Sequence, residues 1–239
     1  MKLLSILKKN MFKIKKNKSY SQFGQDKYVY SSFFKGKKDG FFIEVGVDDG
    51  VDKSNTLFFE EIGWKGICIE PSPIRFKSLE RNRNCILVNK AIHVEKKDFD
   101  FIDIVGYGKG LSGIVENYNL EHFERIEKET TINKNTISKS KIKVSSIPLS
   151  EVIETNKVRH ISYLSIDVEG GEQDVLKSIN FDSVLIDVIS VENNYEDKLI
   201  KVFLSERGFK YHTKIGIDDI YLRKGLKIKK QSIFSKLFS

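Results

Sequence analysis

The chain is poor in cysteine and contains no long apolar run. Its two cysteines, Cys68 and Cys85, fall in apolar stretches without the spacing of a metal or redox motif. We therefore expect buried thiols in a reducing compartment, which argues against a secreted, disulfide-stabilised domain. The apolar run near the start, Leu3 to Leu7, is too short for a secretory signal or a membrane span. A cytoplasmic location is the expectation.

Acidic residues are missing from both ends of the chain. The net charge is +8, yet residues 1–18 carry seven Lys and residues 226–239 carry four, with no acid in either segment. Subtracting these eleven charges leaves −3 for residues 19–225. The domain thus lacks the basic surface typical of nucleic-acid binders, and we expect no specific nucleic-acid partner. The tails, the second of them amphipathic, could contact the inner face of a membrane or a partner protein, or remain solvated.

Short apolar runs alternate with helix-like segments, a pattern that predicts an α/β domain with a parallel sheet wrapped by helices. Strands are predicted at 40–47, 66–71, 85–92, 163–169 and 184–192, with an antiparallel pair at 209–215 and 218–224. Helices are predicted at 25–34, 54–62, 72–81, 149–155, 172–179 and 196–207. Segment 106–143 is interpreted as an insertion or lid with one helix near 120–128, after which strand 141–147 returns to the sheet. The domain would then span residues 19–225.

Acidic residues follow the predicted strands at their carboxyl ends. The relevant stretches read "EVGVDDG", "IEPSP", "IDVEGGE" and "SVENN". Open parallel sheets bind ligands just beyond these ends. Four acidic strand ends on one edge therefore predict a binding site there.

The turn after the first strand indicates which ligand this site takes. It lacks the middle glycine of a dinucleotide-binding turn, and Glu44, Asp48 and Asp49 would repel a phosphate. This argues against a nicotinamide-dependent oxidoreductase. S-adenosylmethionine suits an anionic site, because it carries a sulfonium and an ammonium and no phosphate. Glu70, which ends the second strand, would accept hydrogen bonds from the ribose hydroxyls, as acidic residues do in dinucleotide folds.

The segments "FFIEVGVDDGVDKSNT", "GWKGICIEPSP" and "YLSIDVEGGEQDVL", with "SQFGQD" at 21–26 and "GLSGI" at 110–114, resemble the FkbM-type methyltransferase family. The resemblance runs from about residue 21 to about residue 224. It implies a class I methyltransferase, Rossmann-like fold: a seven-stranded, mostly parallel sheet with helices on both faces and an antiparallel last strand. It also implies S-adenosylmethionine-dependent O-methylation of a sugar, glycan precursor or similar metabolite.

Cofactor contacts are predicted around the first two strand ends and the insertion. Glu44 and Gly46 are placed under the methionine portion and adenosine, Asn55 near the methionine carboxylate or as a helix cap, and Asn89 beside the adenine. The full set of predicted cofactor-binding residues is Glu44, Gly46, Asp49, Asn55, Glu70, Pro71, Asn89, Ser112 and Asp167.

Removal of the acceptor's proton is the main chemical task, because the methyl donor's leaving group is already good. Asp167 or Glu169 is predicted as the general base. Alternatively, Asp167, Glu169 and Glu192 would hold a divalent cation, Mg²⁺ or Ca²⁺, that acidifies the hydroxyl. The metal-free version is favoured because no histidine accompanies the cluster. Glu172 is interpreted as a first-turn helix carboxylate. His122 lies in the predicted lid, where a solvated position is favoured over one that approaches an acceptor.

Two other classes of function remain open at this point. One is a nucleic-acid methyltransferase, which the charge distribution disfavours. The other is a non-catalytic scaffold that binds the cofactor and joins a membrane-associated glycan assembly through its tails. The scaffold would bind cofactor without turnover.

Overall fold

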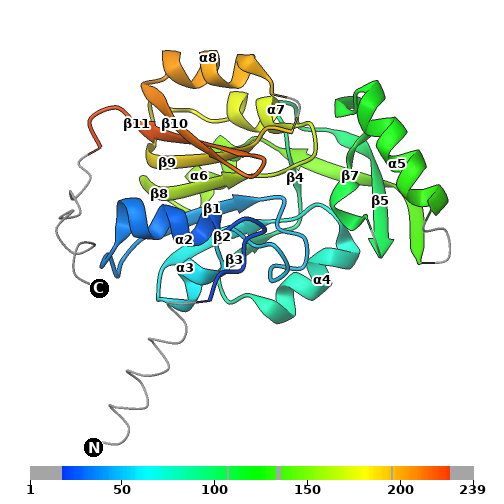
Figure 1. Ribbon diagram of the computed structural model, residues 1–239, viewed down its shortest axis with the longest axis horizontal. Coiled ribbons are helices and arrows are strands. Elements are labelled where there is room, and N and C mark those ends of the chain that lie inside the picture. The colour runs from blue at the N-terminus through cyan, green and yellow to red at the C-terminus, as the bar shows by residue number, and fades with distance from the viewer. Residues whose placement is uncertain (1–17, 107, 133–135, 195, 227–239) are drawn as a thin grey trace, which may run out of the picture.

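The computed structural model describes residues 18–106, 108–132, 136–194 and 196–226, which form two sheets lying side by side (Figure 1). The larger sheet has the strand order β10-β11-β9-β8-β1-β2-β3. Its strands are β1 (Phe41–Val45), β2 (Lys65–Ile69), β3 (Ile86–Val88), β8 (His160–Ile166), β9 (Leu185–Glu192), β10 (Phe209–Ile215) and β11 (Asp218–Arg223). β11 runs antiparallel to both of its neighbours, whereas β3, β2, β1, β8 and β9 are mutually parallel. The α/β class is confirmed, and the sheet is mixed.

Helices cover both faces of this sheet. One face packs against α2 (Gln25–Val29), the π-helix η1 (Tyr30–Phe34), α3 (Leu57–Glu61) and α4 (Pro73–Asn82); the other packs against α6 (Leu149–Thr155), α7 (Glu172–Lys177) and α8 (Lys198–Glu206). Side chains alternate between the faces of a strand. In β1, Ile43 and Val45 belong to the α6–α8 core, while Phe42 belongs to the α2–α4 core. This alternation directs Glu44 toward the α3 side.

The predicted strand 85–92 is wrong as a single strand. It divides into β3 in the large sheet and β4 (Ala91–Ile92) in the small one. Asn89 lies at the break, where its side-chain amide donates to the carbonyls of Glu70 and Pro71. The amide thereby ties the end of β3 to the turn after β2.

The predicted return of 141–147 to the large sheet is also wrong. These residues belong to β7 (Ile137–Ile147), which pairs antiparallel with β5 (Asp98–Gly106) in a four-stranded sheet of order β4-β7-β5-β6, where β6 is Gly113–Ile114. Phe99, Phe101 and Val144 form a separate small core between these strands. Lys141 and Lys143 on β7 pair with Asp100 on β5.

The helix predicted near 120–128 is confirmed as α5 (Leu120–Ile132). It follows two short 3-10 turns, η2 (Lys109–Leu111) and η3 (Val115–Asn117), and its Ile126 packs on Ile104 and Leu111. The small sheet and α5 lie beside the large sheet, at the right of Figure 1.

The predicted basic tails, 1–18 and 226–239, lie outside the described residues except for residues 18 and 226. Within the described ranges, no helix has the length and apolar character needed to span a bilayer.

Candidate active site

A cavity of about 480 Å³ lies at the carboxyl ends of β1, β2, β8 and β9 and continues under the segment between β5 and α5. Most of the predicted site residues line it: Glu44, Gly46, Asn55, Glu70, Pro71, Ser112, Asp167, Glu169 and Glu192. Asp49 and Asn89 are not among the lining residues. Asp49 instead accepts hydrogen bonds from the backbone of Val51 and Asp52, closing a turn. The structure therefore gathers residues far apart in sequence around one cavity.

Glu44 is buried, and residues of its own chain occupy its carboxylate. One oxygen accepts a hydrogen bond from the backbone N–H of Asn55 at 2.6 Å, and the other accepts from the hydroxyls of Ser54 and Thr56. The guanidinium of Arg83 approaches the second oxygen at 3.4 Å. Glu44 thus organises the loop before α3, which forms one wall of the cavity.

Gly46 lies where the end of β1 closely approaches the end of β8. Its φ is +83°, in the left-handed region that favours glycine, and a Cβ there would strike the carbonyl oxygen of Asp167. The absent side chain lets the turn after β1 lie directly against the end of β8.

Glu70 is held by the two turns that flank the cavity. Its oxygens accept hydrogen bonds from the backbone N–H groups of Asp48 at 2.9 Å and Ser72 at 2.8 Å, and Arg75 lies 4.0 Å away. Burial raises the pKa of Glu70 to about 7, although Arg75 acts in the opposite direction. Each carboxylate oxygen has a second lone pair, so Glu70 retains acceptor capacity for a ligand hydroxyl.

Arg75 is a site residue that the sequence reasoning missed. From the first turn of α4 it pairs with Asp48 and Asp103 and donates to the hydroxyl of Ser112 and the carbonyl of Ile104. It therefore joins the large sheet to the small one across the cavity. The available signal was a basic residue one turn into the helix that follows an acidic strand end.

Asn55 presents a buried acceptor without a partner. Its side-chain amide nitrogen donates to Ser165, but Oδ1 has no hydrogen-bond partner among the described residues. Asn55 is not the helix cap: the N-cap position of α3 is Thr56, and the hydroxyl of Ser54 accepts a hydrogen bond from the backbone of Leu57. A buried unsatisfied acceptor costs free energy, so Oδ1 is a natural contact for a ligand N–H or ammonium group.

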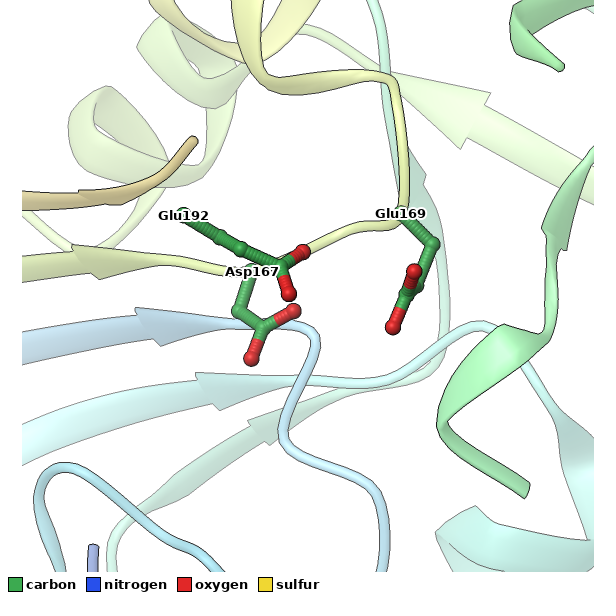
Figure 2. A group of neighbouring side chains, drawn as sticks. All are labelled: Asp167, Glu169 and Glu192. Carbon is green, nitrogen blue, oxygen red and sulfur yellow. The ribbon is translucent and has the colours of Figure 1, made fainter. Parts of the chain in front are cut away.

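Three carboxyl groups converge at the ends of β8 and β9. Oxygens of Asp167, Glu169 and Glu192 all lie within 4.8 Å of one another, and Figure 2 shows them directed toward one space. Burial raises the pKa of Glu192 well above its usual range, and the charge of Asp167 adds to this shift. Burial raises the pKa of Asp167 as well, although a side-chain hydrogen bond with Glu192 acts in the opposite direction.

Glu169 differs from Asp167 and Glu192 in its backbone conformation. It has a φ of +55°, and two other non-glycine residues with positive φ, Asp48 and Lys53, also line the cavity. Such conformations cost of order 1 kcal/mol and tend to cluster at functional sites. Burial also raises the pKa of Glu169 well above its usual range. The negative charges of Asp167 and Glu172 raise this pKa further.

Glu172 holds the turn between β8 and α7. Its Oε1 accepts hydrogen bonds from the backbone N–H groups of Val168 and Gly170. Burial raises its pKa to about 7. The interpretation of Glu172 as a helix-start carboxylate agrees with these contacts.

The prediction of a solvated His122 is wrong, because its side chain on α5 is 1% exposed.

The "SQFGQD" stretch anchors a further wall of the cavity. Asp26 accepts hydrogen bonds from the hydroxyls of Ser19 and Ser21, and Ser21 forms a β-bridge with Lys53.

These features agree with the comparison to known families. The family model described as the methyltransferase FkbM domain matches residues 44–211, which is more than half of the chain. The chain therefore belongs to the FkbM methyltransferase family, whose chemistry in general implies S-adenosylmethionine as the methyl donor. No curated protein matches the chain.

Proposed function

We propose that this protein transfers a methyl group from S-adenosylmethionine to a hydroxyl oxygen of a sugar, glycan precursor or similar metabolite. The observation that carries the proposal is the anionic cavity of about 480 Å³, whose lining includes several buried carboxyl groups and Asn55. Those groups fit a ligand with a positive charge, hydroxyls and an ammonium group. They do not fit a pyrophosphate.

The residues fit the donor at three points. Glu70 would hold the ribose hydroxyls, and Asn55 Oδ1 would accept a hydrogen bond from the ammonium group rather than meet the carboxylate. Gly46 leaves the turn after β1 open to close approach. When bound, S-adenosylmethionine supplies an activated methyl group on a positively charged sulfur.

The protein's own contribution is alignment and proton removal. Asp167 and Glu169 line the part of the cavity where the ends of β8 and β9 face the insertion. An ionised carboxylate there would take the hydroxyl proton of the acceptor as its oxygen attacks. A second version remains, because oxygens of Asp167, Glu169 and Glu192 lie within 4.8 Å of one another, a spacing at which they could share a divalent cation.

Titration calorimetry with S-adenosylmethionine tests the cofactor assignment. We expect the wild type to bind and Glu70→Ala to weaken binding by roughly tenfold or more, about 1.4 kcal/mol. Glu80→Ala, on the exposed side of α4, is the matched control and should bind like the wild type. Glu70→Gln keeps the side-chain shape if the alanine variant is unstable. Unchanged binding by folded Glu70 variants would remove the assignment.

Turnover is tested separately. A panel of nucleotide sugars and glycans is screened for formation of S-adenosylhomocysteine, with and without a chelator. Loss of turnover with the chelator, restored by Mg²⁺, would favour the metal version over the general-base version. Cofactor binding without turnover on any acceptor would instead support the non-catalytic scaffold.

A further inference from the structure

His122 is a buried histidine whose two ring nitrogens face different partners. Its Nε2 lies 3.2 Å from the carbonyl oxygen of Leu111, and its Nδ1 lies 3.8 Å from Oε2 of Glu169. The ring stacks on Tyr118, with centroids 4.2 Å apart and planes inclined by 28°. The Tyr118 hydroxyl also donates to the Leu111 carbonyl. The imidazole is therefore fixed in position and in the plane of its ring.

The Leu111 contact determines the tautomer of His122. A carbonyl oxygen can only accept a hydrogen bond, so Nε2 carries the hydrogen. In the neutral ring, the lone pair of Nδ1 is then on the side of Glu169. At 3.8 Å this contact is longer than a hydrogen bond, and catalytic contacts often tighten only once substrate is bound.

The insertion surrounds the Glu169 carboxyl group on more than one side. Besides His122 on α5, Gly110 lies close by: a Cβ at that position would be 3.6 Å from Oε1 of Glu169. Glu169 itself comes from the large sheet, at the end of β8. Its carboxyl group is thus the point where the acidic strand ends meet the insertion.

We propose that His122 is a positioning residue for Glu169, which receives the proton of the acceptor hydroxyl; this inference rests on the proposed function. In that step the acceptor O–H bond breaks and its electron pair forms the O–CH₃ bond. The bond between methyl carbon and donor sulfur breaks with its pair staying on sulfur, and the proton goes to the Glu169 carboxylate. Once the proton is on Oε2, Nδ1 of His122 accepts a hydrogen bond from it and so stabilises the protonated carboxyl group.

Two isosteric substitutions separate this role from simple packing. The amide of His122→Asn occupies the place of Nδ1 and keeps a partner for Glu169, whereas the amide of His122→Gln reaches toward the Leu111 carbonyl and leaves Glu169 without one. We expect kcat to fall ~10- to 100-fold in His122→Gln with little change in the KM for the acceptor, and to stay within about fivefold of wild type in His122→Asn. Equal kcat in both folded variants would overturn the positioning role.

A second measurement needs no acceptor. In protein carrying ¹⁵N-labelled histidine, NMR should show the Nε2–H tautomer for His122. The Nδ1 resonance should move in Glu169→Gln but not in Glu121→Gln, which changes an exposed residue beside His122 on the same helix. An Nδ1–H tautomer, or an Nδ1 resonance insensitive to Glu169, would overturn the inference even if neither His122 variant folds. Failure of the proposed function would instead appear as absent S-adenosylmethionine binding by the wild type.

Discussion

The carboxylates at the ends of β1 and β2 differ from those at the ends of β8 and β9 in how their charges are compensated. Glu44 accepts hydrogen bonds from three successive residues and faces Arg83, and Glu70 accepts from two backbone N–H groups near Arg75. Asp167, Glu169 and Glu192 are packed against one another. The chain's own donors and cations therefore compensate the carboxylates of the first edge, whereas the carboxyl groups of the second edge mainly face one another.

Among the predicted changes, removing Arg83 should reduce the free energy of unfolding most, because it disrupts the ion pairs at the ends of β1 and β2. Its guanidinium pairs with Glu44 at 3.4 Å and Glu60 at 2.7 Å and donates to the carbonyl of Gly50. Arg83→Met would leave two buried or half-buried carboxylates without their cation, at a cost of ~3–5 kcal/mol in the free energy of unfolding. Denaturant unfolding measures this loss.

The control for this prediction is Arg81→Met, on an exposed position near the end of the same helix. We expect it to change the free energy of unfolding by less than ~0.5 kcal/mol. If both variants lose the same small amount, the buried ion pairs at this edge do not stabilise the loop before α3.

At Gly46 the turn after β1 lies directly against the end of β8. A side chain at this position should push the two apart. Gly46→Ala adds a Cβ against the carbonyl of Asp167 as well as the cost of a positive φ. Gly63→Ala carries a similar φ of +101° with no atom within 4 Å of the new Cβ. We expect a loss of ~1 kcal/mol for Gly63→Ala and ~3 kcal/mol or more for Gly46→Ala, measured by thermal or denaturant unfolding. Similar losses would mean that the strand ends can move apart freely.

The sequence was informative where chemistry is local to a strand end. The acidic residues after β1, β2, β8 and β9 were predicted to meet at one edge because the carboxyl ends of parallel strands share that edge. The hydrogen bonds and the ion pair that Glu44 forms with Ser54, Thr56 and Arg83 were not predictable. The packing of α3 and α4 determines which residues become its partners. What a carboxylate does depends on donors that only the folded chain brings near it.

The small sheet was missed for a different reason. Residues 98–101, "DFDF", alternate acidic and apolar side chains, the period expected of a strand with one buried face. Its partner β7 begins 31 residues after Gly106, where β5 ends, and such a distant pairing has no local signal. The burial of His122 has the same origin, because it depends on contacts with Tyr118 and Leu111 that form only when the insertion folds back on the large sheet.

The second edge can be tested with a smaller change, Glu192→Gln. Burial and the charge of Asp167 raise the pKa of Glu192, so the folded protein keeps a proton there that the unfolded chain loses above its ordinary pKa of 4.5. Between these two pKa values the free energy of unfolding of the wild type must therefore fall as pH rises.

The side-chain amide of Glu192→Gln can donate to Asp167 in place of the carboxyl proton. Its oxygen can still accept a hydrogen bond from Asn194, which donates to Glu192 in the wild type. We expect the variant to match the wild type near pH 5 and to exceed it by ~1 kcal/mol at pH 8, as measured by denaturant unfolding across that range. Glu206→Gln, at an exposed position on α8, should follow the wild-type curve. A variant less stable than the wild type at every pH would show that Glu192 is ionised and paired with a cation, and that the second edge is compensated like the first.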